Sequence, residues 1–166
     1  MDFKVAFQGR SHLYTKEEVA LATEVMQTAI PLTQGQYQKN FEAQLRQKIN
    51  AEHAFILNSA TSGLEMAAQL CQFEEGDEVI IPSHTFTSSA YPFIKKGAKI
   101  KWADIDYETR VVNVNTLEKC LTKKTKAIVV VHLYGYGADM PEIMNFAKKH
   151  GLLVVEDAAQ ALGVKV

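Results

Sequence analysis

Apolar residues in the first fifty positions recur at the spacing of an α-helix. Thr15 opens the sequence Thr-Lys-Glu-Glu, and a glutamate three residues beyond a threonine is typical of an N-terminal capping box. The apolar positions that follow predict a helix that Pro31 ends. A second stripe, formed by Phe41, Leu45 and Ile49, predicts another helix that stops near residue 50. We therefore expect residues 1–50 to form a helical N-terminal arm.

From residue 53 onward, short apolar runs alternate with helical patterns. The runs at 54–57, 78–81, 99–103, 127–131 and 152–155 have the length and composition of five strands. Helices are expected after the loop at 58–63 and over 89–96, 115–121 and 140–150, with Gly97 and Gly151 as C-caps of two of them. This alternation predicts an α/β fold, a mostly parallel sheet with helices on both faces. We place it in one domain over residues 51–166.

Composition narrows the class of protein further. Of 166 residues, 47% are apolar, which is enough for a sizeable core. The 18 lysines and arginines nearly balance 19 acids, so charge gives no support to nucleic acid as a partner. Cys71 and Cys120 form no CxxC pair, which leaves a disulfide framework or zinc site without support. Without a signal-peptide pattern or an apolar run of about 20 residues, a cytoplasmic protein with no membrane partner is expected.

The loop at 58–63 is the first of several polar segments that follow predicted strands, where open α/β sheets bind their ligands. Its small hydroxylated residues, Thr61 and Ser62 among them, precede a helix and suit a phosphate, because the helix N-terminus presents N–H groups. Serine and threonine are also ordinary N-caps, so the loop alone leaves both interpretations open. No GxGxxG or GxxxxGK[ST] motif supports a dinucleotide or a P-loop nucleotide site.

Three further segments carry candidate chemistry. Phe86 lies among hydroxyl residues and could stack on a flat heterocycle, or else pack beneath its loop. His132 could act as an acid–base group or be a satisfied structural histidine. Asp104 and Asp106 end a predicted strand, where aspartates more often cap turns than bind metal, and we assign no metal site.

Asp157 and Gln160 follow the last predicted strand. A carboxylate at a strand end can pair with a protonated ring nitrogen, and Gln160 could donate to the phenolic oxygen of the same ring. Together with a phosphate cradle and a stacking ring, these are three of the four features that pyridoxal phosphate (PLP) requires. The fourth is a lysine for the Schiff base. A helix cap is the alternative for Asp157.

An ordered set of motifs runs from about residue 30 to the end of the sequence. It comprises 58–64, 75–83, 85–86, 97–99, 104–106, 125–128, 132–135 and 155–161. With these motifs the chain resembles the DegT/DnrJ/EryC1/StrS family of PLP-dependent sugar aminotransferases, most of all enzymes that aminate a nucleotide-linked 4-keto-6-deoxyhexose.

The resemblance implies an aspartate-aminotransferase-like (type I PLP) large domain and a homodimer. In that arrangement Thr61 and Ser62 would hold the PLP phosphate, and Phe86 would stack on the ring. Asp157 would pair with the pyridine nitrogen, and Gln160 would contact the ring oxygen. The amino donor would be glutamate, the acceptor a nucleotide-linked keto-sugar, and the product an amino sugar for a polysaccharide or glycosylated metabolite.

The chain departs from the family in one respect. The family's Schiff-base lysine lies beyond the Glu-Asp-Ala-Ala stretch, in a segment resembling Ser-Phe-His-x-x-Lys-Asn, which is not in this sequence. Lys165 is too close to Gly163 for that role, so no catalytic residue is assigned. We expect the N-terminal part of a longer enzyme, with a large domain incomplete at its C-terminus and inactive alone. Two alternatives stay open: a non-catalytic α/β dimerisation or ligand-binding module, and a PLP-dependent deoxysugar dehydratase of the same fold.

Overall fold

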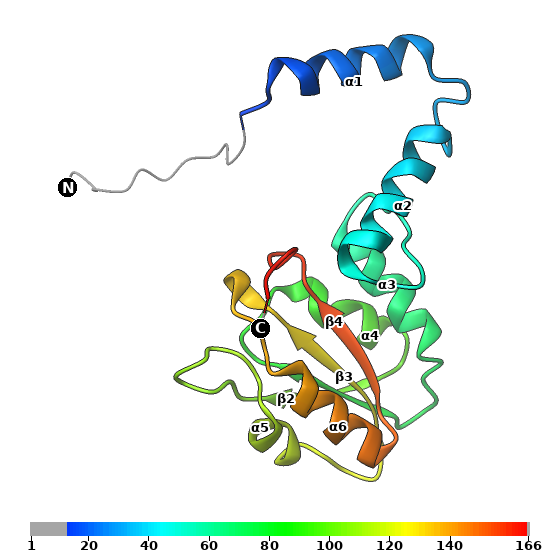
Figure 1. The fold of residues 1–166 in the computed structure, drawn as a ribbon. Helices are drawn as coiled ribbons and strands as arrows, with labels where there is room; N and C mark the ends of the chain where they lie inside the picture. The colour runs from blue at the N-terminus through cyan, green and yellow to red at the C-terminus, as the bar shows by residue number, and fades with distance from the viewer. Residues whose placement is uncertain (1–12, 166) are drawn as a thin grey trace, which may run out of the picture. The chain divides into compact units, whose positions relative to one another are not determined.

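The computed structural model describes residues 13–165, which form two compact units that divide between Ile56 and Leu57. The first unit contains helices α1 (Lys16–Thr28) and α2 (Gln36–Ile49) (Figure 1). The predicted capping box is confirmed: the Glu18 N–H donates to Thr15 Oγ1 at 3.2 Å, and the Thr15 N–H donates to Glu18 Oε2 at 2.7 Å. Both predicted helices of the arm are therefore present.

The prediction of a strand at residues 54–57 is wrong. These residues have no regular secondary structure, and the side chains of Phe55 and Leu57 are 73% and 41% exposed. The Ile56 N–H donates to a side chain, Glu42 Oε1, at 3.1 Å rather than to a neighbouring strand. A strand requires a partner for its backbone groups, and a short apolar run does not reveal whether a partner exists. In residues 13–165 the sheet has no strand paired with this run.

The second unit is built on a parallel sheet of four strands. These are β1 (Glu78–Pro82), β2 (Lys99–Ala103), β3 (Thr125–Val131) and β4 (Leu153–Asp157), in the order β2-β1-β3-β4. The chain moves outward in one direction from β1 to β2 and in the other from β3 to β4. The strand order therefore reverses between β1 and β3, and open α/β sheets bind ligands outside the carboxyl ends of strands at such a point.

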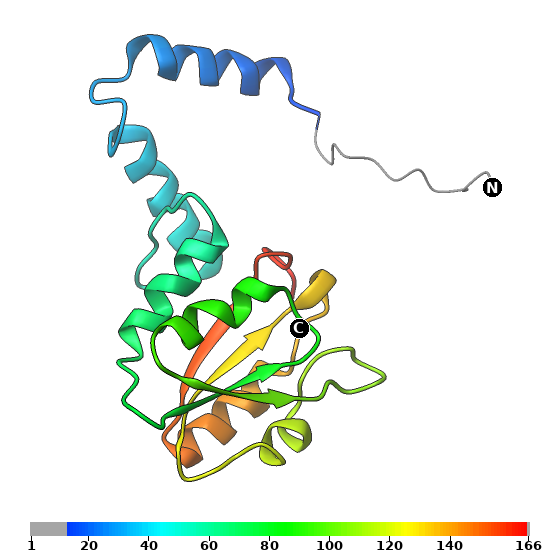
Figure 2. The same ribbon diagram turned by 180° about the vertical axis from the view of Figure 1, so that it is seen from behind.

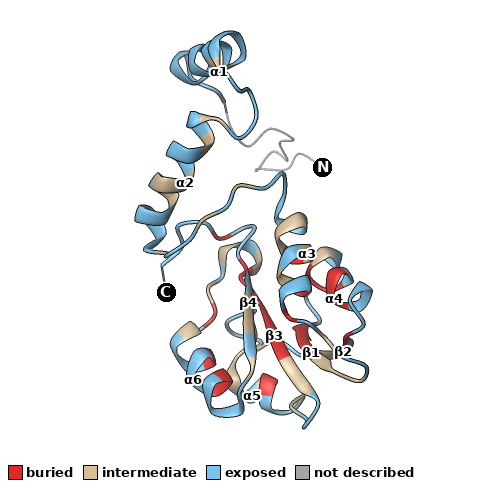
Figure 3. Cartoon of the chain, turned by 90° about the vertical axis from the view of Figure 1, so that its right-hand side faces the viewer, coloured by how far each residue is buried: buried red, intermediate tan, exposed pale blue. Residues whose placement is uncertain are grey.

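Helices cover both faces of this sheet, as predicted (Figures 1 and 2). Val79 and Ile81 of β1 pack with α3 (Ala60–Leu70) and α4 (Tyr91–Lys95). Ile80, between them, faces α5 (Val114–Glu118) and α6 (Met140–His150). Residues of β3 alternate in the same way, and Figure 3 shows both central strands buried. Each fully buried aliphatic side chain contributes about 1.5–3 kcal/mol to stability.

Helix boundaries follow local signals. Helix α6 coincides with the predicted range, and Gly151 is its left-handed C-cap at φ 67°. The helix predicted at 89–96 starts later, because residues 87–89 form a 3-10 turn, η1 (Thr87–Ser89), before α4. Pro92 lies in the first turn of α4, where its missing N–H is tolerated. In residues 13–165 no helix is both long and apolar enough to cross a bilayer.

Candidate functional site

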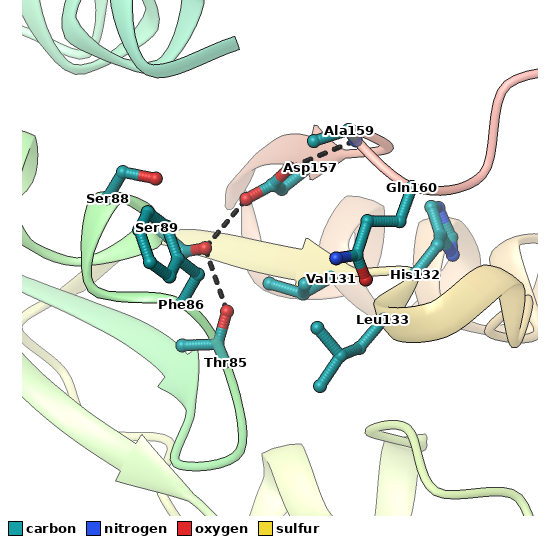
Figure 4. A pocket seen from close by; sticks show the side chains of 10 residues that line it. All are labelled: Thr85, Phe86, Ser88, Ser89, Val131, His132, Leu133, Asp157, Ala159 and Gln160. Atoms are coloured by element: carbon teal, nitrogen blue, oxygen red, sulfur yellow. Dashed lines mark hydrogen bonds between the residues drawn. The ribbon is translucent and has the colours of Figure 1, made fainter. Parts of the chain in front are cut away.

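The segments that follow β1, β3 and β4 enclose a pocket of about 100 Å³ (Figure 4). It lies at the carboxyl ends of the strands, beside the reversal of strand order. Three of the five predicted site residues, Phe86, Asp157 and Gln160, are among those that line it. The remaining residues that line the pocket are Thr85, Ser88, Ser89, Val131, His132, Leu133 and Ala159. The structure thus brings together side chains that lie more than 70 positions apart in the sequence.

Asp157 is a buried carboxylate, with 8% of the residue exposed. Its Oδ2 accepts the Ser89 hydroxyl at 2.6 Å, and its Oδ1 accepts the Ala159 N–H at 3.2 Å (Figure 4). Among residues 13–165 no lysine, arginine or histidine side chain forms an ion pair with it. Burying a carboxylate without a cation is unfavourable. A cationic group that entered the pocket would therefore meet an unneutralised partner.

Ser89 is a site residue that the sequence did not single out. It is fully buried at the end of η1, and its oxygen accepts the Thr85 hydroxyl at 2.8 Å. The segment after β1 contains several hydroxyl residues, and their abundance was the only sign in the sequence that one of them belongs to a site. The sequence could not show which of them faces Asp157, because that depends on packing against β4.

Gln160 is oriented by the segment after β3. Its Oε1 accepts the backbone N–H of Tyr134 at 2.8 Å. This bond identifies the oxygen of the amide, so the Nε2 group is the one left to donate elsewhere. Figure 4 shows the amide nitrogen turned toward the interior of the pocket. The pocket therefore offers an N–H donor beside a buried carboxylate.

Phe86 is 70% exposed at the edge of the pocket. The alternative in which its ring packs beneath the loop is therefore wrong. An exposed aromatic ring beside a pocket offers a flat apolar face to a ligand ring, and such pairs contribute about 0.5–1.5 kcal/mol beyond area burial.

Thr61 and Ser62 do not line the pocket. They lie in the first turn of α3, whose N-cap is Ser59, and the Ser62 N–H donates to Ser59 Oγ at 3.2 Å. The Ser62 hydroxyl donates to Asn58 Oδ1 at 2.7 Å, while Thr61 is exposed. The N-cap interpretation thus holds for Ser59. Helix α3 packs against η1 and β4, which carry Ser89 and Asp157.

His132 has a structural role in the pocket wall. It is 6% exposed, its Nδ1 accepts the Ala138 N–H at 3.1 Å, and its Nε2 lies 3.1 Å from Glu156 Oε2. Because Nδ1 accepts a backbone N–H, the ring proton lies on Nε2 and is donated to Glu156. Both ring nitrogens are engaged, which favours the structural alternative over an acid–base role.

Asp104 and Asp106 close a turn after β2. The Ile105 N–H donates to Asp104 Oδ1 at 2.9 Å. Asp106 Oδ1 accepts the Thr109 N–H at 2.9 Å, and this bond is the main cause that lowers the pKa of Asp106 below its ordinary value. In the described part of the chain, no group of three or more potential metal ligands occurs.

Comparison with known proteins identifies the family. Residues 13–166 match the DegT/DnrJ/EryC1/StrS aminotransferase family. The chain is 34% identical over 151 residues to the GDP-perosamine synthase of Escherichia coli O157:H7, an alignment that covers 91% of this chain and 42% of that protein.

The fold also matches solved structures of other proteins, and two of them are similar over most of this chain. The aminotransferase from Psychrobacter cryohalolentis is 32% identical, with a TM-score of 0.84, over 95% of this chain and 40% of that one. NtdA from Bacillus subtilis, with bound cofactor PMP, is 28% identical, with a TM-score of 0.83, over 91% of this chain and 35% of that one. The chain thus spans 35–42% of the length of these relatives. The predicted fold class is confirmed, and the chain belongs to the DegT/DnrJ/EryC1/StrS aminotransferase family.

Proposed function

We propose that this chain supplies the ring-binding part of a PLP-dependent sugar aminotransferase. The observation that carries the proposal is the buried Asp157 carboxylate, which faces a pocket and has no cation in residues 13–165. A protonated pyridine nitrogen would supply both a positive charge and an N–H donor. When bound, PLP supplies an electron sink for carbanion chemistry, and a carboxylate at the ring nitrogen keeps that nitrogen charged.

Two other pocket residues, and two residues of α3 outside the pocket, fit the same cofactor. Phe86 would stack on the ring, and the Gln160 amide would donate to its phenolic oxygen. Thr61 and Ser62 would contact the phosphate at the N-terminus of α3, where free N–H groups favour anions. The bound PMP in NtdA, a member of the same fold, supports this choice of cofactor.

The proposed reaction transfers an amino group from glutamate to a nucleotide-linked keto-sugar, with a 4-keto-6-deoxyhexose as the favoured acceptor. The similarity to a GDP-perosamine synthase supports this substrate class. In this proposal residues 1–50 are a helical arm and residues 51–166 are part of the PLP-binding large domain. The enzyme is a cytoplasmic homodimer.

Residues 1–166 by themselves would bind the cofactor without completing transamination. The family resemblance puts the Schiff-base lysine in a segment that these residues do not contain. We therefore expect no conversion between PLP and PMP when the polypeptide of residues 1–166 is mixed with PLP and glutamate.

Binding of pyridoxamine phosphate (PMP) to residues 1–166 tests the proposal. PMP is the better probe, because its amine cannot form Schiff bases with surface lysines as PLP does. We expect Asp157→Asn to weaken PMP binding at least about tenfold, since an interaction with a charged group is lost. Asp104→Asn, which removes an exposed carboxylate after β2, should leave the affinity unchanged. PMP binding that is equally strong in Asp157→Asn would contradict the proposal and favour a module with another ligand.

A further inference from the structure

We infer that Thr85 and Ser89 form a one-way hydrogen-bond relay that positions the Asp157 carboxylate for a cationic ring nitrogen. This inference rests on the proposed function and makes Ser89 a positioning residue, which acts on the ligand only through Asp157. It adds two hydroxyl groups to the pocket residues that the sequence pointed to.

The relay links two distant parts of the second unit. Thr85 Oγ1 donates to Ser89 Oγ at 2.8 Å, and Ser89 Oγ donates to Asp157 Oδ2 at 2.6 Å (Figure 4). Ser89 and Asp157 are 68 positions apart, and Ser89 is fully buried. In a site shielded from water, such a bond competes little with solvent and holds its partners firmly.

The direction of the relay follows from the number of protons. A serine hydroxyl has a single proton, and the Ser89 oxygen already accepts the proton of Thr85. The Ser89 proton is therefore given to Asp157 Oδ2. Since the Ala159 N–H donates to Oδ1, both carboxylate oxygens act as acceptors, which matches an ionised carboxylate with further lone pairs free for a ligand.

The position of Asp157 in the sheet explains why it needs such support. It is the last residue of β4, which lies at one end of the strand order, with β3 between it and β1. Ser89 follows β1, so its hydrogen bond reaches past the end of β3 to β4. Without that bond, the only other hydrogen bond to the carboxylate in residues 13–165 is from Ala159, two residues away in the sequence.

A ligand-free measurement tests the positioning directly. The side-chain rotamer of Asp157 can be followed by three-bond NMR couplings in residues 1–166. We expect one rotamer in the wild type and averaging over rotamers in Ser89→Ala and Thr85→Val. Thr85→Ser, which keeps the hydroxyl, and Thr87→Ala, a nearby exposed control, should retain one rotamer. If Ser89→Ala does not fold, the Asp157 rotamer measured in Thr85→Val tests the inference instead. A single Asp157 rotamer in either folded relay variant overturns the inference.

A second measurement tests the consequence for the ligand. Affinities are compared for PMP and for its carbocyclic analogue, in which a CH group replaces the ring nitrogen. The wild type should prefer PMP, and Ser89→Ala and Thr85→Val should each reduce this preference about tenfold. A preference that is unchanged in both variants overturns the relay while the proposed function stands. Equal or absent binding of both ligands by the wild type overturns the proposed function, and the rotamer measurement then still decides on the relay.

Discussion

The side-chain oxygen of Gln160 accepts the backbone N–H of Tyr134 at 2.8 Å, which fastens the segment after β4 to the segment after β3. Tyr134 has a left-handed backbone, with φ at 56°, a conformation that is uncommon for residues other than glycine. The contact fixes which end of the Gln160 amide faces the pocket. The donor and acceptor roles of this residue can therefore be separated by substitution.

The substitution Gln160→Glu keeps an oxygen that accepts from Tyr134 and replaces the amide donor by a second carboxylate oxygen. We expect Tm to change little and PMP affinity to fall about tenfold, because a donor is lost and a negative charge is added near Asp157. Calorimetric titration with PMP measures the affinity. Gln47→Glu, at an exposed position of α2, should leave PMP affinity unchanged. Unchanged affinity in Gln160→Glu would contradict the proposed donor role.

Phe86 and Phe55 form a matched pair for testing ring stacking, since they are 70% and 73% exposed. Phe86→Ala should weaken PMP binding about 3- to 10-fold, the range expected for loss of an aromatic pair. Phe55→Ala, outside the pocket, should not. Neither substitution should lower Tm appreciably, because little buried surface is lost. Equal PMP affinities for the two variants would show that the Phe86 ring does not contact the ligand.

Thr61 is tested with two ligands that differ only in the phosphate. Thr61→Val should lower the affinity for PMP about tenfold and leave that for pyridoxamine unchanged, because only PMP carries the charged acceptor. Thr87→Val provides a control at another exposed threonine. A loss of affinity that is equal for both ligands would place the effect elsewhere than at the phosphate.

Substitutions of Phe93 and its neighbour Ile94 compare the contribution of a buried side chain to stability with that of an exposed one. Phe93 is fully buried between α4 and the sheet, whereas Ile94 is 52% exposed. Phe93→Ala should lower the free energy of unfolding by about 3–5 kcal/mol, and Ile94→Ala by under about 1 kcal/mol. Urea denaturation at neutral pH measures both values. Similar losses in the two variants would contradict the assignment of Phe93 to the core.

The surroundings of Asp77 predict how the stability of the folded chain depends on pH. Its Oδ2 accepts the Glu74 N–H at 2.8 Å and lies 3.0 Å from Lys126 Nζ, and these groups, with the Glu74 bond first, lower the pKa of Asp77 from its ordinary value of 3.8. A carboxyl whose pKa is lower in the folded chain stabilises it fully above the unfolded pKa. That contribution is lost as the pH falls through the folded pKa. Asp77→Asn should therefore lower Tm at neutral pH and lower it less below about pH 3. A Tm difference that grows toward acid pH would contradict the sign of this shift.

Helices and strands whose ends are marked by residues such as glycine or proline could be predicted from the sequence. Helix α6 begins and ends where the apolar spacing and Gly151 indicate, and β1 ends at Pro82. The run at 54–57 had an equally good strand composition and yet formed no strand. The difference lies in pairing, because β1 has neighbours on both sides, and no local pattern records this.

In the candidate site too, features set by local sequence could be predicted, and features set by long-range contacts could not. The position of Asp157 after an apolar run predicted a carboxylate at a strand end, and it does line the pocket. Ser89 could not be selected from its neighbours Thr87 and Ser88, because the contact that distinguishes it joins segments 68 positions apart. Long-range contacts of single side chains are set by the packing of β4 beside β3, which residue spacing does not encode.

Because β4 ends the strand order, the backbone groups on its outer side have no strand neighbour in residues 13–165, and the Leu153 residue of this strand is half-exposed. Edge strands open at lower free energy than central ones, so in the polypeptide of residues 1–166 the amides of β4 should exchange with solvent by local opening well before those of β3. Any such opening would also release Asp157. The affinity of the pocket for its ligand would then be reduced by the fraction of time that β4 spends detached, and a ligand held by Asp157 would in turn slow hydrogen exchange along this strand.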